Sequence, residues 1–343
     1  MRSTRRPLPA LLALLIAVTA ALTAAPALAA PPATATEAPA LSATDRAHVV
    51  AEKRVSDRIL DVTVWSPALR QNATARLLLP DGWERRQGRH WPTLWLLAGC
   101  CSLESHTGWT AFTDVEDRPE LRDVLVVMPD AGLAGFYSDW WNGGRGGAPA
   151  WETFHLGELR GLLERDYGAG PRRAVAGLSM GGFGALSYAA RHPGMFRAAA
   201  SYSGLIHNLH PGGPQYAFPT GAAFVQALLK AAGDDPNALW GDPEKQRRIW
   251  AVHNPYDLAI FLRNIPVHIS AGTGEPGPLD APGKQPDKAE ALLHAEAVDV
   301  VDRLRSLGGR VSATLGEPGT HDWPYWEREL HKSLPMLLDA IRK

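Results

Sequence analysis

The chain has 343 residues, of which 45% are hydrophobic and 21% are charged, and its formal net charge is −1. A chain of this size and composition can bury a large core. Its charges are scattered, with no basic patch or tail, so the sequence predicts no nucleic-acid partner.

Residues 1–29 have the pattern of a secretory signal peptide. Three arginines give a positive start, an apolar run follows at 8–22, and Ala27-Leu28-Ala29 is a small-residue cleavage site. The alternative is an N-terminal membrane anchor, but the run is short and rich in alanine for a membrane span. A lipoprotein is not expected, because no cysteine directly follows the run. We expect a secreted, extracellular protein without stable membrane insertion after cleavage. Its mature chain would carry a charge of about −4, because the signal holds three arginines and no acid.

The remainder divides into a linker and one predicted catalytic domain. Residues 30–45 are rich in Pro, Ala and Thr without an apolar face, so we expect a disordered linker. Residues 46–343 have an even composition and no internal repeat. Their length suits a single α/β domain.

Predicted strands and helices alternate along residues 46–343. The runs Ile59–Trp65 and Ala73–Leu79 predict an opening β-hairpin. Thr93–Leu97 and Val124–Met128 are continuous apolar runs, typical of strands that are buried on both faces. The later elements are expected as helix 151–167, strand 173–178, helix 181–191, strands 198–203 and 267–271, helix 287–307, strand 311–315 and helix 323–341.

This alternation predicts a mostly parallel central sheet with helices on both faces. In such a sheet the active groups lie at the carboxyl ends of the strands. The stretch Leu205–Pro255 interrupts the pattern with loops and one helical piece, Ala222–Ala232. We interpret it as a small cap insertion that serves as a lid or substrate wall.

The candidate nucleophile is Ser179 in the turn Gly177-Leu178-Ser179-Met180-Gly181. This is the G-x-S-x-G pattern, which needs a strand before it and a helix after it, and both are predicted here. The serine lies on a tight turn, so the positions two before and two after it must lack a Cβ. The following helix offers free N–H groups to a developing negative charge.

A serine hydroxyl needs a base and an acid that orients the base. The order along such a fold is serine, acid, histidine. His321 follows the strand predicted at 311–315, and we expect it to be the base. His294 and His331 fall inside predicted helices instead.

The acid is expected in the loop that follows strand 267–271. Asp280 and Glu275 are the two candidates. Asp280 is preferred because it follows a stiff Pro-Gly-Pro segment, and Glu275 remains the alternative.

Two backbone N–H groups are expected to form the oxyanion hole. One belongs to Met180, directly after the nucleophile. The other is expected from Cys100, in the loop after strand 93–97, which Gly99 allows to approach closely. Chemistry of this kind requires no cofactor.

Cys100 and Cys101 are the only cysteines, and they are adjacent. In an exported protein they could form a disulfide or remain two thiols, and the sequence leaves this open. Without a histidine at ligand spacing they make a poor metal site, so no metal is predicted. A bridge on the oxyanion loop would make activity sensitive to reduction.

Residues 96–326 resemble the esterase family of the α/β-hydrolase superfamily. They are similar to the secreted antigen 85 mycolyltransferases of mycobacteria and to S-formylglutathione hydrolases. The matching pieces are Gly108-Trp109, Val127-Met128-Pro129, Phe136-Tyr137-Ser138-Asp139-Trp140, Trp151-Glu152-Thr153-Phe154, Gly177-Leu178-Ser179-Met180 and Gly319-Thr320-His321 with Trp323, Tyr325 and Trp326.

The resemblance implies an α/β-hydrolase fold and acyl-enzyme chemistry, with the roles of Ser179, His321, Met180 and Cys100 as given above. In the mycolyltransferases an acidic residue that holds trehalose stands at the position of Ala98, and an arginine at that of Cys101. Both groups are absent here. This favours general ester hydrolysis over mycolyl transfer.

Many of the twelve tryptophans lie beside Gly or Pro, which is consistent with an aromatic-walled cleft. Trp109, Trp140 and Trp323 are the candidate substrate-binding residues.

The sequence therefore predicts a secreted serine esterase acting on a small-molecule or lipid ester. The first alternative is an acyltransferase that uses a sugar or glycerol acceptor. An alternative of another class is a non-catalytic cell-surface binding protein on a hydrolase fold. The sequence makes no prediction of oligomeric state.

Overall fold

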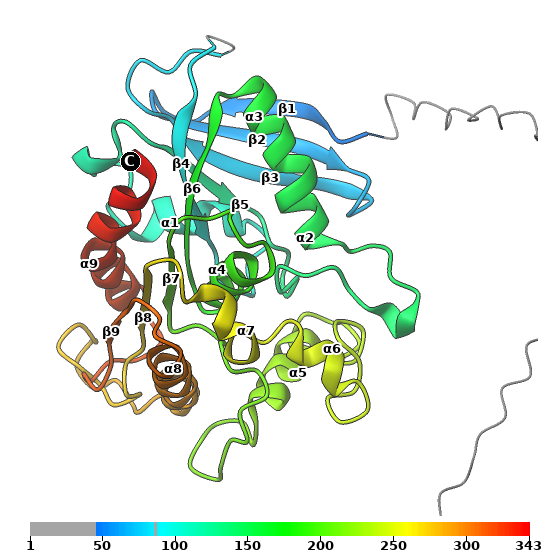
Figure 1. Cartoon of the computed structure of the whole chain (residues 1–343), viewed down its shortest axis with the longest axis vertical. Helices are drawn as coiled ribbons and strands as arrows, with labels where there is room; N and C mark the ends of the chain where they lie inside the picture. The colour runs from blue at the N-terminus through cyan, green and yellow to red at the C-terminus, as the bar shows by residue number, and fades with distance from the viewer. Residues whose placement is uncertain (1–45, 86–87) are drawn as a thin grey trace, which may run out of the picture. The chain divides into compact units, whose positions relative to one another are not determined.

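The structure is a computed structural model that describes residues 46–85 and 88–343, so the predicted signal peptide and linker lie outside the described residues. The described strands form one sheet in the order β1-β2-β3-β5-β4-β6-β7-β8-β9 (Figure 1). Their bounds are β1 His48–Arg54, β2 Ile59–Ser66, β3 Gln71–Leu78, β4 Trp91–Leu97, β5 Leu125–Pro129, β6 Ala169–Leu178, β7 Ala199–Tyr202, β8 Val267–Ser270 and β9 Val311–Thr314.

The sheet is antiparallel at one end and parallel over the rest. β1 pairs with β2, β2 with β3 and β3 with β5 in antiparallel fashion. The remaining strands, in the order β5, β4, β6, β7, β8 and β9, run parallel to one another. The predicted hairpin is confirmed, with Ile59 opposite Leu78 and Ser66 opposite Gln71. The α/β-hydrolase class with a mostly parallel sheet is likewise confirmed.

Helices connect the parallel strands. The described α-helices are α1 Gly108–Phe112, α2 Trp151–Thr153, α3 Arg160–Asp166, α4 Met180–Arg191, α5 Gly221–Ala231, α6 Arg247–Ala251, α7 Pro255–Leu262, α8 Lys288–Ser306 and α9 Trp323–Arg342. A π-helical stretch, Phe154–Leu159, joins α2 to α3. The three together correspond to the helix predicted over 151–167. No helix among the described residues is long and apolar enough to cross a membrane.

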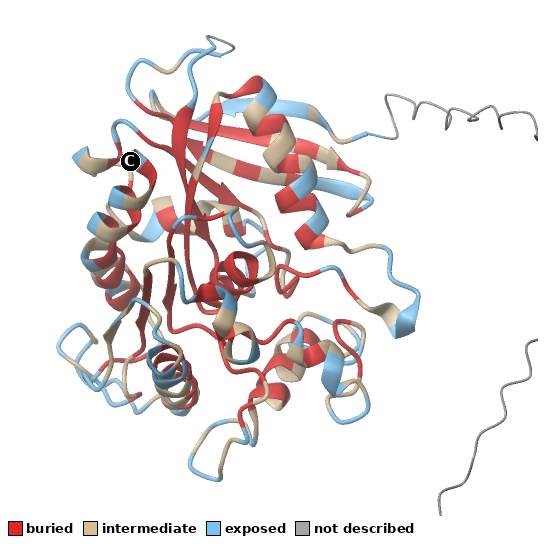
Figure 2. Cartoon of the chain, in the orientation of Figure 1, coloured by how far each residue is buried: buried red, intermediate tan, exposed pale blue. Residues whose placement is uncertain are grey.

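Apolar side chains alternate between the two faces of the sheet, as strand geometry requires. On β4, Leu94 and Leu96 belong to the cluster that α9 covers. Trp95 and Leu97 belong to the cluster that α4 and α8 cover. Strands β4 and β5 are buried along their whole length, within the mostly buried centre of the sheet in Figure 2. This double burial explains why their sequences are continuous apolar runs.

Strand β1 was not predicted from the sequence. Six of its seven residues are exposed. Its sequence, HVVAEKR, also mixes charged with apolar side chains. As an edge strand it takes its conformation from hydrogen bonds to β2 rather than from an apolar face, so it leaves a weak pattern.

The predicted insertion between β7 and β8 contains α5 and α6. Its Trp240 packs against Phe136 and Phe183, with ring centroids 5.7 and 5.3 Å away. The N–H of His207 donates to Glu296 Oε2 on α8 at 3.0 Å. These contacts attach the insertion to α4 and α8.

Candidate active site

Ser179 lies on the turn between β6 and α4 in a strained conformation, with φ 54° and ψ −122°. A Cβ at Gly177 would lie 2.2 Å from the Gly181 carbonyl oxygen, and one at Gly181 would lie 2.3 Å from the Leu97 carbonyl oxygen. Neither approach is possible for a larger residue, so the turn requires both glycines. The N–H of Ser179 donates to the Tyr202 carbonyl at 2.9 Å, which fixes the turn to β7.

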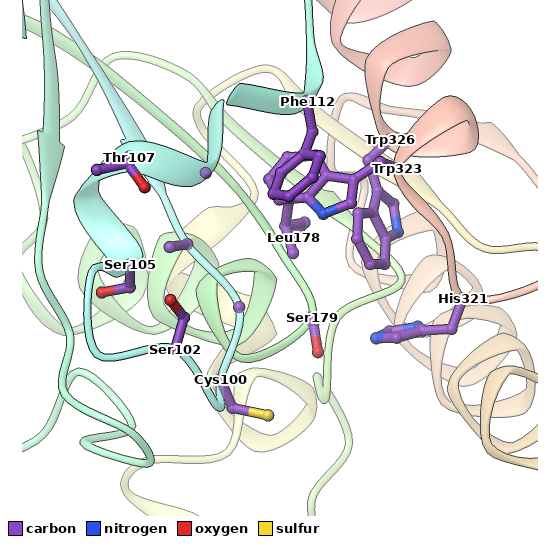
Figure 3. A pocket seen from close by; sticks show the side chains of 13 residues that line it. Cys100, Ser102, Ser105, Thr107, Phe112, Leu178, Ser179, His321, Trp323 and Trp326 are labelled. Atoms are coloured by element: carbon purple, nitrogen blue, oxygen red, sulfur yellow. The ribbon is translucent and has the colours of Figure 1, made fainter. Parts of the chain in front are cut away.

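His321 lies in the loop between β9 and α9, and its imidazole points toward the side chain of Ser179 (Figure 3). Its backbone N–H donates to Asp287 Oδ2 at 3.2 Å. The ring of Trp326 meets the imidazole edge-on at 4.8 Å. Ser179 Oγ has no hydrogen-bond partner among the described residues. Catalytic hydrogen bonds of this kind often form only when substrate binds.

Glu290 is the carboxylate that contacts His321. Its Oε2 lies 2.6 Å from His321 Nδ1. Its Oε1 accepts hydrogen bonds from Ser203 Oγ at 2.7 Å and from the Gly272 N–H at 2.8 Å. The side chain has no exposed surface. A buried carboxylate with both oxygens occupied holds a single orientation toward the ring.

The expectation that Asp280, or else Glu275, faces His321 is therefore wrong. Asp280 accepts hydrogen bonds from Thr320 Oγ1 at 2.5 Å, Tyr325 Oη at 2.8 Å and the Gly277 N–H at 2.8 Å. Burial alone would raise the pKa of Asp280, but these hydrogen bonds outweigh it and hold the pKa below its usual value. Asp280 thus orders the loop beside His321.

Glu275 is an exposed residue of the same loop. Its backbone carbonyl accepts the Gly319 N–H at 2.7 Å, and its own N–H contacts Thr273 Oγ1 at 3.4 Å. Among the described residues its side chain contacts no histidine. The loop turns Glu275 outward, whereas the first turn of α8 brings Glu290 back to the imidazole.

The predicted oxyanion loop approaches Ser179 closely. A Cβ on Gly99 would lie 2.8 Å from Leu178 Cδ1 and 3.4 Å from Ser179 Cβ. Tyr137 Oη donates a hydrogen bond to the Ala98 carbonyl at 2.8 Å, which holds the loop in place.

Cys100 and Cys101 are joined by a disulfide, which decides the alternative that the sequence left open. The Cys101 N–H donates to the Leu133 carbonyl at 2.8 Å, and Cys101 has a positive φ of 75°. Cys100 lines the cavity that holds Ser179. The bridge is therefore part of the cavity wall.

The cavity has a volume of about 240 Å³, and its lining includes both hydroxyl-bearing and aromatic side chains. In Figure 3, hydroxyl groups lie on one side and aromatic rings on the other. The hydroxyl residues are Ser102, Ser105 and Thr107, and the aromatic residues are Phe112, Trp323 and Trp326. Of these residues, only Trp323 is among the predicted substrate-binding residues. Phe112 was not predicted, although it is a large apolar residue in the same short helix as the predicted Trp109.

Two of the three predicted substrate tryptophans do not line this cavity. Trp109 is fully buried, and its Nε1 donates to the Leu97 carbonyl at 3.2 Å. Trp140 lines a separate hollow beside Trp151. None of the residues lining the Ser179 cavity comes from 205–255, so the interpretation of that insertion as a wall of this cavity is also wrong.

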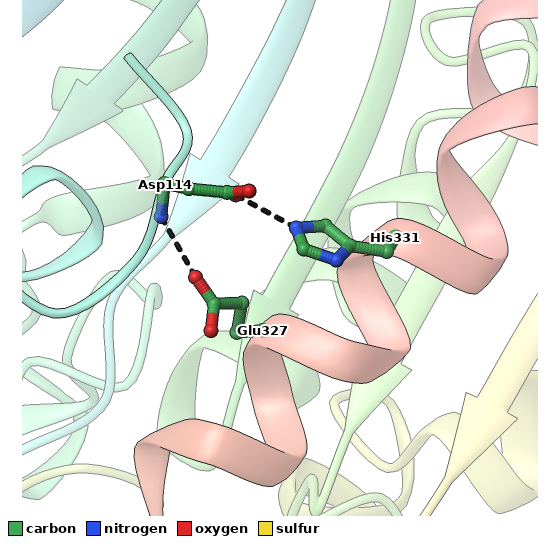
Figure 4. A group of neighbouring side chains, drawn as sticks. All are labelled: Asp114, Glu327 and His331. Carbon is green, nitrogen blue, oxygen red and sulfur yellow. Dashed lines mark hydrogen bonds and ion pairs between the residues drawn. The ribbon is translucent and has the colours of Figure 1, made fainter. Parts of the chain in front are cut away.

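A group of possible metal ligands lies outside the cavity. Asp114, Glu327 and His331 bring one potential ligand atom each within 4.8 Å of one another. His331 Nε2 contacts Asp114 Oδ1 at 2.7 Å, and the Asp114 N–H donates to Glu327 Oε1 at 2.8 Å (Figure 4). Because these atoms already satisfy one another, they connect α9 to the segment after α1.

Comparison with known proteins identifies the chemistry class. A family model described as "Putative esterase" matches residues 66–337. Diacylglycerol acyltransferase/mycolyltransferase Ag85A of Mycobacterium tuberculosis is 29% identical over 262 residues, covering 74% of this chain and 75% of that protein. Ag85B of Mycobacterium leprae is 30% identical over 258 residues, covering 73% and 76%.

Solved structures agree on the fold. MPT51 of Mycobacterium tuberculosis superposes with a TM-score of 0.64 at 25% identity, covering 81% of this chain and 96% of that one. An S-formylglutathione hydrolase of Agrobacterium tumefaciens gives 0.60 at 16% identity, covering 85% and 99%. The matches show an enzyme that acts on esters, as a hydrolase or an acyltransferase. The chain belongs to the esterase family.

Proposed function

We propose that this protein is a secreted serine esterase that hydrolyses carboxylic esters through an acyl-enzyme on Ser179. The observation that carries the proposal is the hydrogen bond between the buried Glu290 and Nδ1 of His321, a histidine that lines the same cavity as Ser179. A nucleophile, a base and an orienting acid are the parts that acyl transfer by serine requires.

Glu290 sets the protonation of the imidazole. An ionised carboxylate accepts hydrogen bonds only, so the proton between it and His321 lies on Nδ1. His321 Nε2 then carries a lone pair and can take the proton of Ser179 as the hydroxyl attacks the ester carbonyl. The negative charge of Glu290 also stabilises the imidazolium that forms in this step.

The oxyanion would lie against two N–H groups. That of Met180 is in the first turn of α4, where N–H groups have no partner within the helix. That of Cys100 belongs to the loop that approaches Ser179, and it donates to no described residue, unlike the neighbouring Cys101 N–H. Each donor of this type contributes roughly 3–4 kcal/mol to transition-state stabilisation.

The reaction then completes in two stages, which are release of the alcohol and hydrolysis of the acyl-enzyme. His321 gives its proton to the leaving alcohol, which departs and leaves the acyl group on Ser179. The neutral imidazole next takes a proton from water, the resulting attack releases the acid, and the serine regains its proton. These steps use side chains and backbone groups of this chain without a cofactor. Export by residues 1–29 is part of the proposal and rests on the sequence pattern alone.

The test is hydrolysis of p-nitrophenyl acetate by the wild type and by Ser179→Ala. The proposal expects turnover by the wild type and a fall to the background rate in the variant, with an unchanged circular-dichroism spectrum. Full activity in a folded Ser179→Ala protein would refute it. For export, expression in a secreting host should release a chain that begins near residue 30.

Acyl transfer is the second candidate, because the relatives Ag85A and Ag85B are named acyltransferases. The acyl-enzyme is common to both reactions, and only the acceptor differs. Product analysis with a simple acyl ester, in the presence and absence of glycerol or a sugar, separates them. Free acid as the main product supports hydrolysis, and an acylated acceptor as the main product supports transfer.

The alternative of a non-catalytic binding protein predicts that one of the catalytic groups is missing. Ser179, His321 and a carboxylate on His321 are all present in one place. A chain that folds but hydrolyses no ester would favour this alternative.

A further inference from the structure

Phe112 is a large apolar side chain in an unusual position. It is 60% exposed and yet lines the cavity that holds Ser179. Its ring stacks on Trp323 with the centroids 5.0 Å apart and the planes at 26°. One face of the phenyl ring is therefore covered by the indole, which leaves the other face free to contact a bound group.

The stacked pair is fixed from behind. Trp323 meets Trp109 edge-on at 5.6 Å and Trp326 edge-on at 5.3 Å. A Cβ on Gly108 would lie 3.1 Å from the Trp323 ring, so this glycine lets α1 come close to the indole. Trp323 is consequently a rigid support for Phe112.

Hydrogen bonds beyond the rings hold the two helices together. Asp114, two residues after Phe112, contacts His331 Nε2 and donates its N–H to Glu327 on α9 (Figure 4). Trp323 is the first residue of α9. The Phe112–Trp323 wall thus has its two halves fixed relative to each other, and little ordering is required when a ligand binds.

The position of the wall relative to His321 decides which part of the ester it contacts. Trp323 follows His321 by two residues, and the ring of Trp326 contacts both Trp323 and His321. His321 is the group that protonates the leaving alcohol, so the alcohol must lie beside the imidazole. The aromatic wall is therefore on the alcohol side of the reacting ester.

The size of the cavity limits what fits. A cavity of about 150 Å³ can hold a benzene ring, and the volume here is about 240 Å³. A single ring with its ester group fits this space, whereas a long chain would extend into solvent. Phe112 and Trp323 offer such a ring apolar area and an offset-stacked or edge-on contact.

We propose that Phe112 is a specificity-determining residue that selects esters of compact aromatic alcohols. This rests on the proposed function, because it uses His321 as the group that protonates the alcohol. The free face of the Phe112 ring receives the aromatic ring of the alcohol, and Trp323 holds Phe112 in place. Alcohols without a ring lack this contact.

The experiment compares benzyl acetate with ethyl acetate for the wild type, Phe112→Ala, Phe112→Tyr and Phe261→Ala. Phe261 is the matched control, because it is 52% exposed on α7 and does not line the cavity. In Phe112→Ala, kcat/KM for benzyl acetate is expected to fall about tenfold, and that for ethyl acetate less than about twofold. Phe112→Tyr keeps an aromatic ring and should retain the wild-type preference for benzyl acetate. Phe261→Ala should not change this preference.

The hydrolysis of the acetyl-enzyme gives a second readout. Both esters form the same acetyl-enzyme, so its decay, measured by single-turnover kinetics, is expected to be equal in the wild type and in Phe112→Ala. A slower decay would place the Phe112 ring on the acyl side and overturn the proposal. An equal fall of kcat/KM for both esters would overturn it as well.

Failure of this inference can be told from failure of the proposed function. Phe112→Ala should still react with a fluorophosphonate at Ser179, because the wall does not contain the nucleophile. If the wild type hydrolyses neither ester and does not react with the probe, the proposed function fails. If the wild type hydrolyses the esters and reacts with the probe, but has no preference for benzyl acetate that depends on Phe112, only the inference fails.

Discussion

His321 Nδ1 and Glu290 Oε2 lie 2.6 Å apart, and the carboxylate has no exposed surface. The other oxygen of Glu290 accepts from Ser203 Oγ and from the Gly272 N–H. Ser203 Oγ in turn accepts from Trp326 Nε1 at 3.1 Å. The orientation of the imidazole is therefore set by a connected network rather than by a single contact.

Replacing Glu290 by glutamine should disable this network with little change in shape. The glutamine oxygen can keep the bonds from Ser203 and Gly272, which turns its NH₂ toward His321. An NH₂ group donates to Nδ1 and forces the imidazole proton onto Nε2, where it blocks the base. By analogy with serine proteases, kcat should fall roughly 1,000- to 10,000-fold.

The exposed Glu275 provides the matched control for that change. Glu275→Gln is the same chemical replacement, and it should leave kcat within a few-fold of the wild type because its side chain contacts no histidine. Asp280→Asn should likewise leave most of the activity. Loss of activity in Glu275→Gln or Asp280→Asn with retention in Glu290→Gln would contradict the assignment of the acid.

Gly99→Ala should displace the oxyanion loop. The added Cβ would lie 2.8 Å from Leu178 Cδ1 and 3.4 Å from Ser179 Cβ, so the loop must move away from Ser179. Loss of one donor corresponds to roughly a 100- to 1,000-fold decrease in kcat. KM should change less, because the donors act mainly in the transition state.

Gly161→Ala is the control for Gly99→Ala. Gly161 lies in α3, and no atom lies within 4 Å of a Cβ added there. Alanine in this position should retain wild-type kcat and raise the melting temperature slightly. Equal kcat in Gly99→Ala and Gly161→Ala would show that the loop does not supply an oxyanion donor.

Reduction of the Cys100–Cys101 disulfide should lower activity moderately. The bridge stiffens the loop that carries the Cys100 N–H, but the Ala98 carbonyl and the Cys101 N–H keep their own hydrogen bonds. A loss of about two- to tenfold in kcat, well below the loss of a whole donor, is therefore expected after treatment with a reductant. The double variant Cys100→Ser/Cys101→Ser should not respond to the reductant. A wild-type rate that is the same before and after reduction would contradict this role.

Glu296 should make the protein less stable as the pH rises. It is fully buried, its Oε1 has no hydrogen-bond partner among the described residues, and burial raises its pKa to about 8. The unfolded chain has a glutamate pKa of about 4.3, so between these values the folded state holds a proton that the unfolded state releases. The stabilisation is complete below pH 4 and is lost as the pH rises toward 8.

Thermal unfolding of the wild type and Glu296→Gln from pH 5 to pH 8.5 tests this expectation. The glutamine cannot titrate, so the melting temperature of Glu296→Gln should fall less over this range than that of the wild type. Glu275→Gln, at an exposed position, should keep the wild-type slope. Parallel curves for the wild type and Glu296→Gln would exclude the effect.

The sequence predicts the parts of the fold that local pattern determines. Apart from Thr93, the runs at 93–97 and 124–128 are apolar because the strands are buried on both faces, and the structure has β4 and β5 there. The turn at Ser179 is readable because only glycine fits at 177 and 181. The carboxylate that contacts His321, Glu290, lies between Ser179 and His321 in the chain, as the predicted order requires of the acid.

Glu290 itself was not predicted, for a physical reason. The sequence at 287–290 has the pattern of a helix start. Asp287 is the N-cap of α8, and its Oδ1 accepts hydrogen bonds from the N–H groups of residues 289 and 290. In that pattern a glutamate at 290 is expected to bond back to the N-cap N–H. Here the Asp287 N–H donates to the Gly274 carbonyl, which frees Glu290 for His321. Only the path of the 271–287 loop decides this, and local sequence does not encode it.

The central claim is that Ser179 is the nucleophile, and intact-mass analysis after reaction with a fluorophosphonate tests it most directly. We predict a single adduct on the wild type, mapped to the peptide that contains Ser179, and no adduct on folded Ser179→Ala. Glu290→Gln should react much more slowly at the same residue. An adduct of equal yield on Ser179→Ala, or none on active wild-type protein, would contradict the claim.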